Sequence, residues 1–447
     1  MTLSFILLIL AVSWIIVGTT RYKIHPFLVL LSASIFLAIG TGIPLKELPL
    51  LLGKGFGKTT QSIGLLILFG TIIGVVLEVS HATQTIAKLL LNGLQKLPLP
   101  YAVSCIGYLV SIPVFCDSAF VILSSLNKSL SAQTKTPLVA LTVALSTGLF
   151  APHVLVPPTP GPLAAAANLE LDNLFLLIVS GGILAFVLIL AGAAYASFLA
   201  QKLPYQPPSS KAIKEKEEHQ ALPSFSSAIG PIIVPIVLMA IGTFLSFISF
   251  PPRLSFLKEI LAVLCTPTFA LGIGMLLSFR LLSYTTIAVN DLVQKGIAVA
   301  APILVITGMG GTLGLIIQQL PLTEFVEQNL SQSSWGLLIP FLIAAILKTA
   351  QGSSTVAIIT TSSIVFPLLA VLGLDNEMGK VWVILAIGVG SMTVSHANDS
   401  YFWIVSQMGG LNIKTAYRHH TFGTFIQGSL GIILVLLGHW LSQMIFA

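Results

Sequence analysis

Charged residues are scarce in this chain of 447 residues. Asp, Glu, Lys and Arg account for 8% of it, 55% of the residues are hydrophobic, and the mean hydropathy is +0.98. About a quarter of the residues in a typical soluble domain are charged, so the composition excludes a soluble globular protein and indicates an integral membrane protein. Uncharged runs at 25–45, 174–200 and 421–447 exceed the about 20 residues that a helix needs to cross a bilayer.

Regular alternation of apolar and polar residues is also missing, which excludes the lipid-facing strands of a membrane barrel. The membrane segments are therefore predicted to be helices, about 12 to 14 of them when partial crossings are counted. The expected fold class is an all-α polytopic membrane bundle. The first apolar run, 1–18, has neither a basic start nor a convincing small-residue cleavage site, so we expect a retained helix rather than a signal peptide.

Cysteine is rare as well. Cys105, Cys116 and Cys265 lie in apolar segments without paired spacing, so neither a disulfide framework nor a zinc site is expected, and each is interpreted as a core residue. No metal site and no cofactor are predicted. The net charge of +6 is typical of the cytoplasmic loops of membrane proteins and does not indicate binding to nucleic acid.

One segment is plainly polar. Residues 202–227 are rich in Pro, Ser and mixed charge, which cannot bury a core. The segment is predicted to be a soluble linker between a first membrane half, 1–201, and a second membrane half, 228–447.

The two halves resemble each other weakly, with their motifs in the same order. His396 follows His153 by 243 residues, and Leu411 follows Leu169 by 242. Such ordered similarity favours an internal duplication of the kind found in transporters, and chance similarity between Leu-rich segments is the alternative.

The matched regions contain residues that disfavour a continuous helix. "PPTPGP" at 157–162, "TGMGG" at 307–311 and "TAQGSST" at 349–355 are all expected to break one. A broken helix in lipid exposes unpaired backbone groups, so it is tolerated only where protein or a water-filled cavity covers it. Paired breaks in corresponding places of two halves therefore point to a central transport site.

Asp399 is the only charged residue between Lys380 and Lys414, and His396 precedes it by three positions. If this piece is helical, the two side chains share a face. An isolated carboxylate within a membrane costs roughly 3 kcal/mol, so it is paired, protonated or in contact with water. Because imidazole titrates near neutral pH, His396 and Asp399 are predicted to carry a proton. A structural ion pair that locks two helices is the alternative.

Three further isolated polar residues have two interpretations each. Asp117 would be a partner for a cation or proton, or a helix cap. Lys348 would attract an anionic substrate, or would extend its ammonium group to the interface. His153 would contact the ligand or carry a proton, or would be a packed core histidine.

Hydroxyl and amide side chains cluster beside the predicted breaks. They can bond a carboxylate or a polyhydroxylated ligand together with helix N-termini, although membrane Ser and Asn often only link helices. The substrate-binding residues predicted here are Ser353, Ser354, Thr355, Asn398 and Ser400, along with His153 and Lys348.

Four motifs together resemble the gluconate permease family of proton symporters, from about the second helix to the C-terminus. They are "IPVFCDSAFVIL" at 112–123, "PPTPGP" at 157–162, "AQGSSTVAIITT" at 350–361 and "SHANDSYFW" at 395–403. The resemblance implies proton-coupled uptake of a small sugar acid such as gluconate across the bacterial inner membrane. It also implies two inverted repeats, each with a re-entrant hairpin and a broken helix, that meet at the substrate.

The chain departs from the pattern of that family at two positions. Thr159 stands where the family often has a histidine, and Tyr401 stands where it often has a small residue. Because members of the family transport different hydroxy acids and even D-serine, these departures bear on the substrate. The expected partners are a small carboxylate, a proton and the lipid bilayer; a homodimer is left open.

Two other functions compete with a proton symporter. Oxygen atoms beside "AQGSST" could coordinate Na⁺, so a sodium-coupled carrier or a passive channel is the first alternative. An intramembrane protease is the second, and the absence of H-E-x-x-H and G-x-S-x-G motifs disfavours it.

Overall fold

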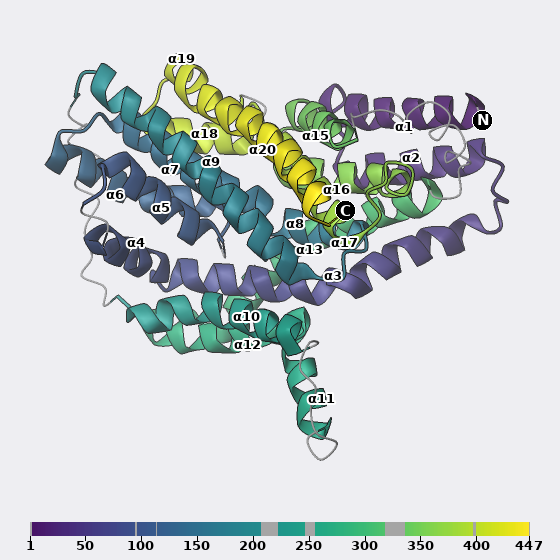
Figure 1. Cartoon of the computed structure of the whole chain (residues 1–447), viewed down its shortest axis with the longest axis horizontal. Helices are drawn as coiled ribbons and strands as arrows, with labels where there is room; N and C mark the ends of the chain where they lie inside the picture. Colours follow the sequence, from purple (N-terminus) through teal and green to yellow (C-terminus); the bar gives the residue numbers. More distant parts are fainter. Residues whose placement is uncertain are drawn as a thin grey trace.

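The computed structural model describes residues 2–93, 96–112, 114–206, 222–245, 255–317, 336–396 and 399–446, and every regular element in them is a helix (Figure 1). This confirms the predicted all-α class. The helices of the first half are α1 (Thr2–Thr20), α2 (Pro26–Gly40), α3 (Leu48–Val79), α4 (Ala82–Gly93), α5 (Leu99–Ser111), α6 (Cys116–Thr134), α7 (Leu138–Leu155), α8 (Pro160–Asn168) and α9 (Leu174–Lys202). Those of the second half are α10 (Phe225–Leu245), α11 (Ser255–Leu264), α12 (Pro267–Ser278), η3 (Phe279–Tyr284), α13 (Val289–Ile317), α15 (Leu338–Gln351), α16 (Ser354–Val365), η4 (Phe366–Leu368), α17 (Glu377–Met392), α18 (Ser400–Met408), α19 (Ile413–Thr415), the π-helical turn η5 (Ala416–Thr421) and α20 (Phe422–Phe446). Most of the predicted linker, 207–221, lies outside the described residues.

Helices of two lengths make up the membrane part. Six in the described residues are long and apolar enough to cross a bilayer alone, and α3, bent by 48°, can supply a seventh span. Five shorter apolar helices of 10–17 residues accompany them, among them Leu99–Ser111, Leu338–Thr349 and Ser354–Leu368. A helix of that length falls short of the about 20 residues needed to cross, so part of the 12 to 14 expected segments are partial crossings.

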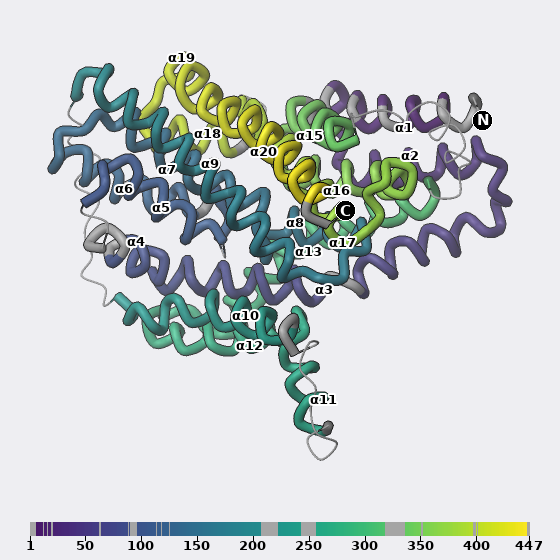
Figure 2. The backbone as a smooth tube through the Cα atoms, in the orientation of Figure 1, coloured from purple at the N-terminus to yellow at the C-terminus, as the bar shows by residue number. Residues whose placement is uncertain are grey.

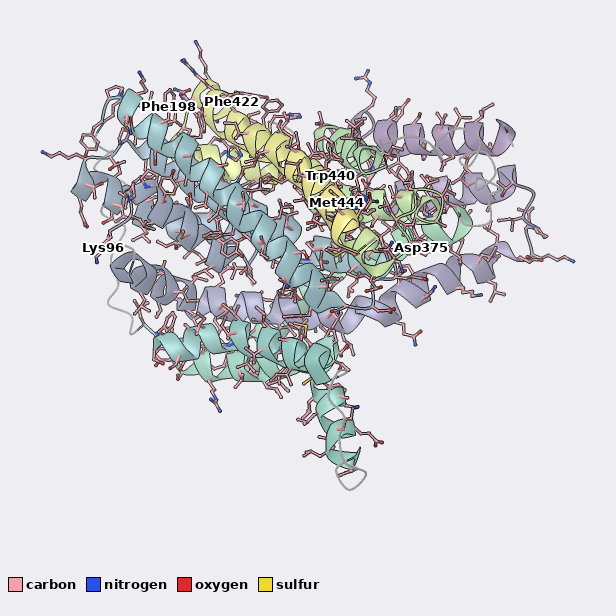
Figure 3. The ribbon with its side chains drawn as sticks, viewed as in Figure 1. Lys96, Phe198, Asp375, Phe422, Trp440 and Met444 are labelled. Atoms are coloured by element: carbon pink, nitrogen blue, oxygen red, sulfur yellow. The ribbon has the colours of Figure 1, made fainter. Side chains whose placement is uncertain are left out.

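The core and the lipid-facing surface are formed by different helices. Every residue of α7 from Ala140 to Leu155 is buried, whereas α20 carries large exposed apolar side chains, including Phe422, Trp440 and Met444. Figure 3 shows these three spread along α20, with Phe198 on the neighbouring α9. In water such a surface would be unstable; against acyl chains it is the expected one.

Each half contains a helical hairpin followed by a broken helix. The hairpins are α5–α6 and α15–α16, and the broken helices are α7–α8 and α17–α18. Helix α16 begins at Ser354, 238 residues after α6 begins at Cys116, and α18 begins at Ser400, 240 residues after α8 begins at Pro160. The breaks predicted at 157–162 and 349–355 are therefore confirmed.

The break predicted at "TGMGG" is wrong, because α13 runs without interruption from Val289 to Ile317. Its glycines instead allow a close approach to α3. A Cβ atom at Gly308 would lie 2.6 Å from the ring of Phe56, and one at Gly311 would overlap Thr59. Small residues at a crossing let two membrane helices pack backbone to backbone, so this motif serves packing.

At the centre of the molecule, helices of each half pack against helices of the other half. Helix α16 of the second half packs on α8 of the first, and α6 of the first half packs on α18 of the second. In the tube view (Figure 2) the green and yellow helices α15 to α20 of the second half lie between the purple α1 and α2 and the blue α5 to α7 of the first half. The helix breaks of both halves are thereby brought into the interior.

Candidate functional site

A buried ion pair lies at the helix breaks of the second half. Nζ of Lys348, in the last turn of α15, lies 2.6 Å from Oδ2 of Asp399, which precedes α18. The two side chains are only 1% and 4% exposed. Removing two charges from water is expensive, so such a pair persists only with good geometry and further hydrogen bonds.

Local backbone features place these two charges. Helix α15 is followed by its C-cap Gly352, whose φ of +76° is readily adopted only by a residue without a Cβ. Lys348 lies one turn before this end, with its Nζ 3.5 Å from the Gly352 carbonyl oxygen. Asp399 is the N-cap of α18, and its Oδ1 accepts from the Tyr401 N–H at 3.1 Å.

The remaining acceptor capacity of the carboxylate is also used. The Ser395 hydroxyl donates to Oδ2 of Asp399 at 2.6 Å, so this oxygen receives both a hydroxyl and an ammonium group. Lys348 also lies over the ring of Phe150 on α7, with Nζ 5.6 Å from the centroid. Such a cation–π contact adds about 0.5–2 kcal/mol to holding the ammonium there.

The expected geometry of His396 and Asp399 needs correction. Residues 394–396 are not helical, so the two side chains do not share a helix face. The Asp399 N–H donates to the His396 carbonyl oxygen at 2.8 Å, so these two residues are joined through the backbone. The ion-pair partner of Asp399 is Lys348 instead.

The other predicted site residues occupy three places. Ser353 is the N-cap of α16, accepting from Val356 N–H at 3.3 Å, and Ser354 and Thr355 form the first turn of the same helix. Asp117 lies in the first turn of α6, the corresponding position in the other hairpin. Asn398 and the side chain of Ser400 lie outside the described residues.

His153 lies near the C-terminal end of α7 and is buried. Its ring centroid is 6.0 Å from that of Phe115, and its Nδ1 has no hydrogen-bond partner among the described residues. A buried imidazole nitrogen without a partner is costly, which fits a group that meets a ligand or water.

Sequence reasoning missed His420. This residue lies in the π-helical turn η5, is fully buried, and places Nε2 3.2 Å from Ser395 Oγ and Nδ1 3.1 Å from Ser146 Oγ. π-Helical turns inside α-helices occur frequently at functional sites. The available signal was an adjacent histidine pair, "RHHT", directly before a long uncharged run.

A cavity of about 420 Å³ lies between α3, α8, α13 and α16. Its lining includes Lys58 and Glu170, which form an ion pair, and Asn168, whose Oδ1 has no hydrogen-bond partner among the described residues. Because Ser363 at the C-terminal end of α16 also lines it, the cavity faces the end of that helix opposite the N-cap Ser353.

Known permeases and transporters are similar to this chain over nearly its whole length. The sequence pattern of the GntP family of permeases matches residues 2–441. The chain is 32% identical to an uncharacterized permease of Haemophilus influenzae, covering 97% of this chain and 91% of that protein. It is 28% identical to a gluconate permease of Pseudomonas aeruginosa, covering 95% and 94%, and 29% identical to a D-serine transporter of Escherichia coli K12, covering 98% and 98%.

Two solved structures share the fold at 15% sequence identity. The YdaH transporter of Alcanivorax borkumensis aligns with a TM-score of 0.64 over 93% of this chain and 98% of its own. MtrF of Neisseria gonorrhoeae, described with a class of antimetabolite efflux pumps, aligns with a TM-score of 0.62 over 94% and 96%.

These likenesses decide between a transporter and an enzyme. The chain is a membrane transporter rather than an enzyme, and a multi-pass protein of the bacterial inner membrane. It belongs to the GntP family of permeases.

Proposed function

We propose that this permease carries a small hydroxy acid, such as gluconate, into the cell together with a proton. The observation that carries the proposal is the buried ion pair of Lys348 and Asp399 at the helix breaks. Gluconate and D-serine, the substrates in the names of two relatives, share a carboxylate beside a hydroxylated carbon chain. A buried ammonium group is the chemical partner that such an anion needs.

The substrate carboxylate binds between Lys348 and the N-terminus of α16. Helix N-termini carry a partial positive charge and free N–H groups, which favour anions. Ser353 is the N-cap of this helix, and Ser354 and Thr355 lie in its first turn. Asn398, Ser400 and His153 are assigned to the substrate hydroxyls.

Proton coupling follows from competition for one ammonium group. While Asp399 is ionised, it holds Lys348 at 2.6 Å, and the ammonium is not free for a substrate. Protonation of Asp399 leaves Lys348 as an uncompensated buried charge, which is unfavourable by several kcal/mol until an anion replaces the lost partner. Proton and substrate therefore each favour the binding of the other, as linkage requires. His396 and Asp117 assist in carrying the proton.

The transport cycle is alternating access between two inverted repeats, 1–201 and 228–447, joined by the linker 202–227. The matching order of hairpin and broken helix in the two halves supports this arrangement, as does the reciprocal packing of α16 on α8 and of α6 on α18.

Uptake of labelled gluconate into proteoliposomes tests the proposal, with an inward proton gradient, without it, and with choline in place of sodium. We expect accumulation that requires the proton gradient and is unchanged by removing sodium. Accumulation that requires sodium and ignores the proton gradient would support the sodium-coupled alternative. D-Serine replaces gluconate in a parallel series, since the D-serine transporter is as similar in sequence as the gluconate permease.

A further inference from the structure

We propose that His420 relays the proton to Asp399 through the hydroxyl of Ser395; this inference rests on proton coupling as the proposed function. His420 is 0% exposed, and each of its ring nitrogens lies at hydrogen-bond distance from a serine hydroxyl. Ionisable groups inside a membrane protein are expensive and mark proton relays. Both ring nitrogens of this histidine face serine hydroxyls, and one of these hydroxyls contacts Asp399.

The donors and acceptors of this network can be ordered from its geometry. Ser395 donates its hydroxyl proton to Oδ2 of Asp399 at 2.6 Å, so its oxygen accepts from Nε2–H of His420 at 3.2 Å. In a neutral imidazole the other nitrogen is then an acceptor. Nδ1 faces the Ser146 hydroxyl at 3.1 Å, and that hydroxyl proton has the Val143 carbonyl oxygen as an alternative acceptor at 3.1 Å.

The network therefore runs in one direction, from Ser146 on α7 to Asp399. A proton that binds Nδ1 converts His420 to the imidazolium. The Nε2 proton then passes to Ser395 Oγ as Ser395 passes its own proton to Asp399 Oδ2. At the end His420 and Ser395 are neutral, Asp399 is a carboxylic acid, and every hydrogen bond of the network has exchanged its donor and acceptor. The original donors and acceptors are restored when the proton leaves Asp399 by the same route.

The relayed proton arrives at the oxygen that Lys348 holds. Oδ2 of Asp399 accepts from both Ser395 and Lys348. A proton delivered there displaces the ammonium group, which becomes available to a substrate carboxylate. The relay and the competition for Lys348 are thus joined at one atom.

The backbone around the relay is held independently of the imidazole. The Thr421 hydroxyl donates to the Ser395 carbonyl oxygen at 2.6 Å, and the Ser395 N–H donates to Thr424 Oγ1 at 3.0 Å. Thr421 is the last residue of η5 and Thr424 lies in the first turn of α20, so Ser395 remains tied to this segment when His420 is replaced. The variant His420→Gln keeps a donor and an acceptor but cannot pass a proton through a ring.

Two transport assays, net accumulation and exchange, distinguish a proton relay through His420 from a purely structural role of this residue. Proteoliposomes are loaded with the carboxylate that the wild type accumulates, gluconate or D-serine. Net accumulation driven by a proton gradient requires repeated protonation and deprotonation of Asp399. Exchange of labelled for unlabelled substrate, saturating on both sides at equal pH, requires only that the loaded carrier reorients.

We expect His420→Gln to lower gradient-driven accumulation by about 100-fold, the lower end of the effects of a proton-transferring group, and to lower exchange far less. Ser395→Ala should share this pattern, and Ser395→Thr should restore accumulation. His419→Gln is the matched control, because His419 is the adjacent histidine and its Nδ1 lies 3.1 Å from the Tyr195 hydroxyl instead.

Equal losses of accumulation and exchange in His420→Gln would assign the residue a structural role and overturn the relay, as would a variant with unchanged accumulation. If His420→Gln does not yield folded protein, Ser395→Ala and Ser395→Thr decide the question alone. Failure of the proposed function looks different: the wild type itself would then accumulate substrate without regard to the proton gradient.

Discussion

The hydroxyl of Tyr401 on α18 donates to the backbone carbonyl oxygen of Ser146 on α7 at 2.9 Å. The bond joins the broken helix of the second half to the most buried helix of the first. The ring centroid of Tyr401 lies 5.1 Å from that of Phe150 and 5.6 Å from that of His420. The bulky residue that departs from the family pattern is therefore part of the packing beside the ion pair.

Tyr401→Phe should lower the free energy of unfolding by about 0.5–1.5 kcal/mol, because it removes one buried hydrogen bond and keeps the ring. Tyr401→Ala should cost about 3–5 kcal/mol, because it also leaves a cavity. Thermal denaturation of the purified variants in detergent measures both. Equal effects of the two substitutions would show that the ring does not pack as described.

Replacing one member of the ion pair should destabilise the protein more than replacing both. Lys348→Met or Asp399→Leu alone leaves one buried charge without a partner and should cost about 3–5 kcal/mol. The double variant removes both charges and should recover most of that stability, yet it should not transport. A double variant as unstable as the sum of the single variants would mean that the two side chains do not pair.

Gly311→Ala should destabilise the crossing of α3 and α13, because the added Cβ would overlap Thr59. Overpacking of this kind costs about 1–3 kcal/mol. The matched control is Gly57→Ala on α3, where an added Cβ meets nothing within 4 Å. Thermal stability of the two variants should differ clearly; indistinguishable stabilities would contradict the close helix crossing.

The cavity between α3, α8, α13 and α16 should open to one side of the membrane in this conformation. Ala167 lines it. In a variant with the three native cysteines replaced, Ala167→Cys should react with a membrane-impermeant maleimide from one side only. Saturating substrate should change the rate of labelling, because substrate shifts the population of the two access states. Equal labelling from both sides would exclude a vestibule that opens to one side.

The sequence predicted the class of fold well. Scarce charge and long apolar runs predicted the helical membrane bundle, and proline and glycine clusters at 157–162 and 349–355 predicted true helix breaks. Isolated charges in apolar segments singled out Lys348 and Asp399, because the cost of burying a charge is a local property that a sequence displays.

Contacts between residues that lie far apart in the sequence could not be predicted. His396 is the neighbour of Asp399 in the sequence, but the ion-pair partner of Asp399 is Lys348, which comes from another helix. His420 lies outside every motif quoted, and only tertiary packing brings it to Ser395. The glycines of "TGMGG" have low helix propensity, but they also let a helix pack closely against a neighbour. Which effect prevails depends on the neighbouring helix, which the sequence does not show.

In the proposed mechanism, substrate and Asp399 compete for Lys348, so that binding of the anion draws a proton onto the carboxylate. The most direct test is proton uptake by purified protein in weakly buffered detergent solution, followed with a pH indicator as gluconate or D-serine is added. The wild type should take up about one proton for each anion bound, by linkage, and Asp399→Asn should take up none. Proton uptake of the same size in Asp399→Asn, or substrate binding by the wild type without any uptake, would contradict the account.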